Sequence, residues 1–198
     1  STFIPDSYSA RISKGTHRGV KRLGIFARKI YQTHGRCFVL KCDIKKFFPT
    51  LDHKILLDII ARRIKDPDVL WLLKIVVQSF SSEFSDGKNI KGAQIGNLTS
   101  QLFANICMNE LDQFVKQKLK IKYYIRYTDD FVIVHQDKNY LCELKEKIAD
   151  FLESELKLHF HPHKISIRKY RQGIDFLGYV SLPKARVLRT KVKHRIFK

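Results

Sequence analysis

Residues 124–134 read YIRYTDDFVIV, in which two apolar runs flank a pair of aspartates. Both runs are rich in aromatic and β-branched residues, which favour strands. Thr128, Asp129 and Asp130 separate the runs, and Asp tolerates turn geometry. The stretch therefore predicts two neighbouring strands that are largely buried and are joined by a tight acidic turn.

A third aspartate follows another apolar stretch. A buried strand is expected over 36–44, with CFVL at 37–40, and Asp43 stands near its end. Taken alone, each acidic position is also typical of an ordinary surface turn. Together they indicate more, because adjacent carboxylates between buried strands repel one another and lose hydration. If Asp43 lies alongside Asp129 and Asp130, the three carboxylates form a hard-oxygen site of the kind that Mg²⁺ prefers.

The charge of the chain points to the same chemistry. The formal net charge is +19, and it is concentrated at the two ends. Residues 1–36 carry eight Lys and Arg against one Asp, and residues 161–198 carry eleven against one, whereas 37–160 is nearly neutral. Such a field suits a phosphate backbone, although another polyanion is an alternative partner. A basic chain with an acidic metal site is what nucleotidyl transfer requires, since two divalent ions can hold the attacking and leaving oxygens.

The rest of the pattern predicts an α+β fold. We expect helices over 16–33, 51–65, 68–80 and 140–156, a long helix capped by Thr99 or Ser100 and ending near 120, a loop or hairpin over 81–96, and short strands over 164–168 and 176–180. Trp71 and the aliphatic residues over 70–77 are expected in the core. This order predicts an antiparallel sheet covered by helices on one face.

Other classes of protein are disfavoured. No apolar run approaches the roughly 20 residues of a membrane span, so no membrane partner is expected. Residues 1–10 lack the profile of a signal peptide. The four cysteines have no CxxC spacing, which indicates reduced thiols in a cytoplasmic protein.

Five blocks in one order resemble the motifs of reverse transcriptases. They are Cys42–His53 (motif A), Ile95–Gln101 (motif B), Tyr127–Asp130 (motif C), His161–Lys164 (motif D) and Phe176–Tyr179 (motif E). The resemblance implies a polymerase palm, an antiparallel sheet backed by helices, that acts as an RNA-directed DNA polymerase. The implied partners are an RNA template, a DNA primer or cDNA, and deoxynucleoside triphosphates.

The resemblance also assigns roles. Asp43, Asp129 and Asp130 would be catalytic and would bind two Mg²⁺ ions with the Ile44 carbonyl, and Mn²⁺ could replace Mg²⁺. Lys164 would donate a proton to the leaving pyrophosphate, or would only contact a phosphate.

The resemblance implies five substrate-binding residues. Four of them lie within the motifs, and the fifth, Arg11, precedes motif A. Phe48 matches the steric gate against a ribose 2′-hydroxyl, or is a core residue. Ile95, Gly96 and Gln101 would lie at the nascent base pair. Arg11 resembles an arginine near template or nucleotide, or it faces solvent.

Motif B narrows the resemblance. Most bacterial reverse transcriptases begin this motif with Gln-Gly and end it with Ser-Pro, whereas this chain has Ile95-Gly96 and Ser100-Gln101. The departure resembles the enzymes of diversity-generating retroelements, which would imply an accessory protein of the element as a further partner. Two alternatives stay open: a group II intron or other bacterial reverse transcriptase, and a non-catalytic nucleic-acid-binding module.

The resemblance also divides the chain. Residues 1–35 would be the junction of fingers and palm with a basic helix, 36–181 the palm, and 182–198 the start of the thumb. A fingers hairpin and a full thumb are expected elsewhere in a longer enzyme, so this fragment alone is not expected to be fully active.

Overall fold

The computed structural model describes residues 3–86, 89–94 and 96–196. The strands are β1 (Phe38–Cys42), β2 (Tyr124–Tyr127), β3 (Asp130–His135), β4 (Ser166–Lys169), β5 (Ile174–Phe176), β6 (Tyr179–Ser181) and β7 (Arg186–Leu188). The α-helices are α1 (Thr16–His34), α2 (Phe47–Thr50), α3 (His53–Ala61), α4 (Pro67–Gln78), α5 (Leu98–Gln113), α6 (Lys138–Phe151) and α7 (Thr190–Ile196). Short π-helical segments η1 (Phe114–Lys118) and η2 (Leu152–Leu156) extend α5 and α6, and η3 (Tyr170–Gln172) is a 3₁₀ turn.

The main sheet has four strands in the order β2-β3-β1-β4, and every pairing in it is antiparallel. The pair β2–β3 is the one expected from residues 124–134. Because β1 lies beside β3, the strand that leads to Asp43 is next to the acidic turn. The predicted α+β class with an antiparallel sheet is therefore confirmed.

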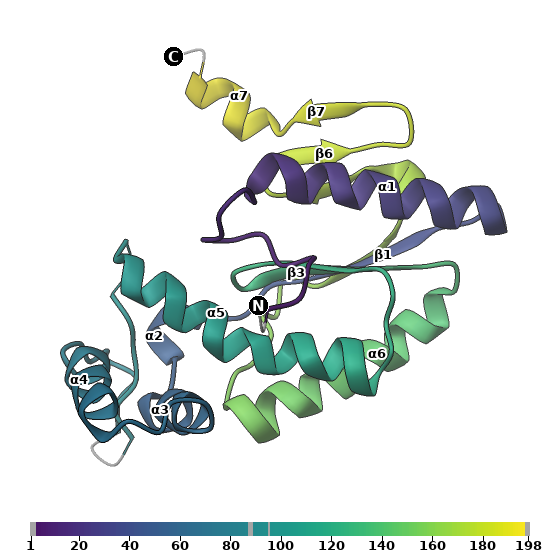
Figure 1. The fold of residues 1–198 in the computed structure, drawn as a ribbon. Helices are drawn as coiled ribbons and strands as arrows, with labels where there is room; N and C mark the ends of the chain where they lie inside the picture. Colours follow the sequence, from purple (N-terminus) through teal and green to yellow (C-terminus); the bar gives the residue numbers. More distant parts are fainter. Residues whose placement is uncertain (1–2, 87–88, 95, 197–198) are drawn as a thin grey trace.

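Helices cover both faces of this sheet, so the expectation of one covered face was wrong (Figure 1). Alternate residues of β1 explain this. Val39 packs in a cluster with Val20 and Leu23 of α1. Leu40 packs instead in the cluster formed with α5 and α6. Since successive side chains of a strand point to opposite faces, two buried neighbours require cover on both sides.

A second, three-stranded sheet, β5-β6-β7, packs against α1 (Figure 1). Where a single strand over 176–180 was expected, β5 and β6 form a hairpin. Leu177 and Gly178 at its turn have φ of 53° and 82°, and positive φ at both central residues is the two-residue turn that matches strand twist. A Cβ on Gly19 of α1 would lie 3.1 Å from the Leu177 side chain, so this glycine allows the close approach.

Capping residues determine where α1 ends and where α5 begins. α1 ends one residue beyond the expected 16–33, where Gly35 has φ of 67° and donates its N–H to Tyr31 O at 2.8 Å. The predicted cap of α5 was wrong: the cap is Asn97, whose side chain accepts from Thr99 N at 3.1 Å. Asn at this position satisfies an N–H that the first turn leaves free. Within the described ranges, no helix is long and apolar enough to cross a bilayer.

The expectation that Trp71 lies in the core was also wrong. Its side chain on α4 is 66% exposed, and Leu72 and Ile75 on the same helix are exposed too. α4 packs on α3 through only part of its apolar surface, and Val77 is its one fully buried residue. An apolar run shows that a helix is hydrophobic, but it does not show how much of the helix is covered.

The difference in exposure between two large apolar side chains predicts that truncating them will lower the free energy of unfolding by different amounts. We expect Trp71→Ala to lower the free energy of unfolding by less than about 1 kcal/mol, as surface substitutions usually do. Leu111→Ala should lower it by about 2–5 kcal/mol, because Leu111 is fully buried and its truncation leaves a cavity. Urea denaturation measures both values. Equal losses would show that α4 is covered in solution.

Candidate active site

Asp43 and the acidic turn meet at one end of the main sheet. In the β1–β3 register, Cys42 lies opposite Phe131, so the residues that follow and precede them, Asp43 and Asp130, are neighbours across the two strands. Asp129 stands in the turn between β2 and β3. The fold thus places Asp43 beside Asp130, with Asp129 next in the chain, and a shared metal site at these three positions stays a prediction.

These carboxylates are poorly hydrated. Asp43 is only 8% exposed, and Asp129 and Asp130 are half-buried. The Oδ1 atom of Asp130 is buried and has no hydrogen-bond partner. A buried carboxylate oxygen without a partner is costly, so it indicates a position that a cation or donor would fill.

The pKa values of the turn residues reflect this environment. Burial raises the pKa of Asp130 to about 6, and the charges of Asp43 and Asp129 add to the rise against the opposing charge of Lys41. Burial also raises the pKa of Asp129, and the charge of Asp43 contributes. The two acids of the turn therefore resist ionisation in the absence of further positive charge.

Lys164 supplies positive charge to Asp43. Its Nζ lies 3.1 Å from Oδ1 and 3.2 Å from Oδ2 of Asp43. The surrounding segment runs alongside the strand end, since His161 N donates to Asp43 O at 2.8 Å and Lys45 N to His159 O at 2.9 Å. Residues from predicted motifs A, C and D thus lie together in space.

The donor set suits a hard divalent cation. Carboxylate oxygens are the ligands that Mg²⁺ prefers, and the unpartnered Asp130 Oδ1 is available to one. In the part of the chain that the structure describes, no three His, Cys, Asp or Glu side chains are already arranged around one metal position. Asp43, Asp129 and Asp130 therefore fit a metal chemically, but their side chains would have to adjust to bind it. Ile44, the predicted carbonyl ligand, is buried and bridges to Phe160.

The residues predicted to contact substrate come from different elements. Phe48 on α2 is half-buried and packs edge-to-face on Phe47, with ring centroids 5.4 Å apart. Gly96 precedes α5 and has φ of 92°, where glycine is favoured. Gln101 lies half-buried in the first turns of α5. Ile95 lies outside the described residues. The substrate roles of all four stay predictions.

Arg11 closes the loop before α1. Its Nη1 donates to Ser7 O at 3.1 Å, to Ser7 Oγ at 3.2 Å and to Ile4 O. These bonds fold the segment over the acidic turn, where Thr128 Oγ1 donates to Ser9 Oγ at 2.6 Å. Contact of Arg11 with template or nucleotide stays a prediction.

The buried ion pair beside the turn was not predicted from the sequence. The side chains of Arg126 and Asp112 are both completely buried, and Arg126 Nη2 lies 2.7 Å from Asp112 Oδ2. The available signal was a charged residue within each of two apolar patterns, the strand over 124–127 and the buried stripe of α5.

The raised pKa of Asp130 predicts how stability depends on pH. The folded-state pKa of about 6 exceeds the ordinary 3.8, so ionised Asp130 destabilises the fold above pH 6. That penalty should fade as the pH falls from 6 towards 4. We expect Asp130→Asn to raise the free energy of unfolding by about 1–2 kcal/mol at pH 7.5 without metal, after allowance for solvent screening. Denaturation with a chelator between pH 4 and 8 measures it.

The control for this prediction is Asp150→Asn, which changes an exposed aspartate on α6. It should leave stability nearly constant over the same range. A gain from Asp130→Asn that is equal at pH 4 and pH 7.5 would contradict the raised pKa.

Comparison with curated proteins gives two informative relatives. Protein YkfC of Escherichia coli is 26% identical, over 90% of this chain and 55% of that protein. The group II intron-encoded protein LtrA of Lactococcus lactis subsp. cremoris is 24% identical, over 73% of this chain and 35% of that protein. The chain thus spans about half the length of the first relative and about a third of the second.

Solved structures share the fold. The apo telomerase of Candida tropicalis, truncated from its C-terminal domain, superposes with a TM-score of 0.69 at 14% identity and covers 93% of this chain and 41% of that one. The likeness confirms a palm-type polymerase fold. The family model described as reverse transcriptase (RNA-dependent DNA polymerase) matches residues 1–181. The chain belongs to the reverse transcriptase family.

Proposed function

We propose that this chain is the catalytic core of an RNA-directed DNA polymerase. It would add deoxynucleotides to the 3′-hydroxyl of a DNA primer or cDNA paired with an RNA template. One observation carries the proposal: Asp43, Asp129 and Asp130 lie at the same end of the main sheet. The buried Asp130 Oδ1, which has no hydrogen-bond partner, and the net charge of +19 support it.

The three carboxylates, with the Ile44 carbonyl, would hold two Mg²⁺ ions or Mn²⁺ in their place, and these ions would stabilise the charge that develops on the transferred phosphoryl group. The Lys164 ammonium contacts the Asp43 carboxylate, and the Lys164 side chain is 55% exposed. From there it would donate a proton to the leaving pyrophosphate. Binding of metal at Asp43 would release this ammonium from its present partner.

The remaining residues would bind and orient substrates. Phe48 would restrict the ribose 2′-position, while Gly96 and Gln101 would lie beside the nascent pair. The basic ends would attract the phosphate backbone, since residues 1–36 and 161–198 carry most of the excess positive charge. Positioning and charge stabilisation, rather than covalent chemistry, would supply the rate enhancement.

The first functional prediction concerns Asp43. In the full-length protein, Asp43→Asn should abolish extension of a primer on an RNA template, because it removes a shared metal ligand. We expect a loss of at least about 10²-fold, because removing one group that stabilises developing charge costs about 10²- to 10³-fold. Primer extension with Mg²⁺ and with Mn²⁺ measures it, and thermal unfolding verifies that the variant is folded.

Asp150→Asn is the matched control and should extend primers at the parent rate. If the parent itself binds primer–template but adds no nucleotide with either metal, the chain is a non-catalytic nucleic-acid-binding module. Full activity of Asp43→Asn would remove the assigned site.

We further propose that this polymerase belongs to a diversity-generating retroelement and has an accessory protein of that retroelement as a partner. Motif B supports this through Ile95 and Gln101, which stand where most bacterial relatives have glutamine and proline. The second candidate is a group II intron enzyme, and the relationship to LtrA favours it. Flanking intron RNA in the genome would support the second candidate, and a template and variable repeat pair would support the first.

Ile95 gives the retroelement proposal a biochemical test. Ile offers contact area but no hydrogen bond to the nascent pair, so correct and incorrect pairs would differ little in transition-state energy. We expect Ile95→Gln to improve discrimination about two- to twelve-fold, the value of roughly 0.5–1.5 kcal/mol for one hydrogen bond. Matched and mismatched incorporation opposite each template base measures it. An unchanged ratio at every base would reduce motif B to a mark of ancestry.

A further inference from the structure

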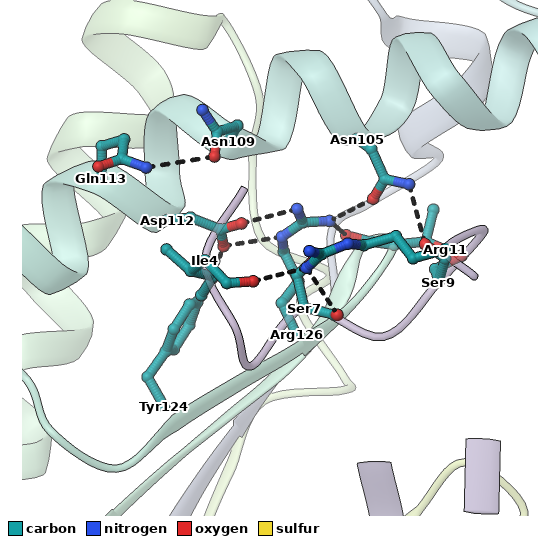
Figure 2. A network of polar contacts seen from close by, with 11 residues as sticks. Ile4, Ser7, Ser9, Arg11, Asn105, Asn109, Asp112, Gln113, Tyr124 and Arg126 are labelled. Atoms are coloured by element: carbon teal, nitrogen blue, oxygen red, sulfur yellow. Dashed lines mark hydrogen bonds and ion pairs between the residues drawn. The ribbon is translucent and has the colours of Figure 1, made fainter. Parts of the chain in front are cut away.

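A buried polar network centred on Arg126 (Figure 2) reaches the acidic turn through a hydrogen bond to the Thr128 carbonyl. It joins α5, β2, the turn and the loop before α1, and its members are Ser9, Asn105, Asp112, Tyr124, Arg126 and Thr128. Arg126 is at its centre and its side chain is completely buried. A cation is seldom fully buried without a specific set of partners, so the partners of Arg126 are informative.

Arg126 has two kinds of partner. On one side, Nε donates to Asp112 Oδ1 at 2.8 Å and Nη2 to Asp112 Oδ2 at 2.7 Å. On the other side, Nη1 donates to Asn105 Oδ1 at 3.1 Å and to the Thr128 carbonyl at 2.9 Å. The guanidinium is a rigid planar fork. Two bonds to Asp112 on α5 therefore fix the direction in which Nη1 meets the turn.

The turn requires such support. Thr128 has φ of 54°, a left-handed conformation that is unfavourable for a β-branched residue. Two hydrogen bonds hold it, from Arg126 to its carbonyl and from its own hydroxyl to Ser9. The Thr128 carbonyl belongs to the peptide unit that leads into Asp129. The orientation of this unit constrains the direction in which the Cα–Cβ bond of Asp129 leaves the backbone.

We propose that Arg126 is a positioning residue for the metal site: by holding the Thr128 carbonyl from a base anchored on Asp112, it directs Asp129 towards Asp43 and Asp130. Arg126 would contact neither metal nor substrate. The proposal rests on the proposed function, because it presumes that the carboxylates bind a divalent cation.

The first test is Mn²⁺ binding to Arg126→Lys, measured by electron paramagnetic resonance of free and bound Mn²⁺. Lysine keeps the charge but cannot bridge Asp112, Asn105 and Thr128 with one fixed fork. We expect affinity to fall about 10- to 100-fold, as for other partners that orient metal ligands. Arg62→Met is the matched control, since it breaks an exposed ion pair with Glu110 of α5, the helix that carries Asp112. It should leave Mn²⁺ affinity unchanged.

The second test separates positioning from simple stabilisation. In Arg126→Met/Asp112→Leu both buried charges are replaced by apolar side chains, which often preserves stability. We expect a melting temperature near that of the parent, with Mn²⁺ affinity still reduced. In the full-length protein, Arg126→Lys should raise the Mg²⁺ concentration for half-maximal extension and leave KM for nucleotide nearly constant.

Each outcome decides between the two proposals. If the parent binds Mn²⁺ and Arg126→Lys binds it equally well, the positioning role is wrong and the metal site stands. Affinity that returns together with stability in the double variant also overturns positioning. A parent that binds no Mn²⁺ overturns the metal site itself, and the positioning proposal fails with it.

Discussion

Arg126 of β2 and Asp112 of α5 form an ion pair in the interior of the protein. Both side chains are fully shielded from water, so breaking the pair by removing either partner would cost about 3–5 kcal/mol. Tyr124 adds a third bond, since its hydroxyl donates to Asp112 Oδ1 at 2.8 Å. The pair fixes α5 to β2 at one relative position. Arg126 also donates to the Thr128 carbonyl in the acidic turn and to Asn105, which in turn donates to Ser9 O in the loop before α1.

Much of this fold could be predicted from local pattern. The apolar runs around Asp129 and Asp130 predicted β2 and β3, and the basic amphipathic run predicted α1, because hydrophobic period and turn residues are local signals. Cover on the second face of the sheet could not be predicted, since a buried strand residue does not reveal what buries it. The exposure of Trp71 escaped prediction for the same reason: how far α4 is covered depends on distant segments of the chain.

The candidate site divides in a similar way. Asp43, Asp129 and Asp130 were predicted as a group, and the strand register places Asp43 beside Asp130. The contact of Lys164 with both Asp43 oxygens could not be predicted from the sequence. It depends on the path of residues 159–164 along the end of the strand, which only the structure shows. Arg126 and Asp112 were not paired from sequence, because each is a single charge in an apolar pattern and nothing local links them. Residues that bear chemistry are marked by type, whereas residues that orient them are marked only by their contacts.

The loop before α1 pairs with one edge of the main sheet. The main sheet has two edge strands, β2 and β4. At β2, Arg126 N donates to Asp6 O at 3.0 Å and Tyr8 N to Arg126 O at 2.9 Å, so main chain from the loop covers part of that edge. At β4 the strand is short and carries exposed Arg168 and Lys169. Exposed edges recruit strands from other molecules. One edge is therefore protected by internal pairing and the other by like-charge repulsion, so high salt would weaken only the second safeguard, whereas displacement of residues 6–8 would open the first.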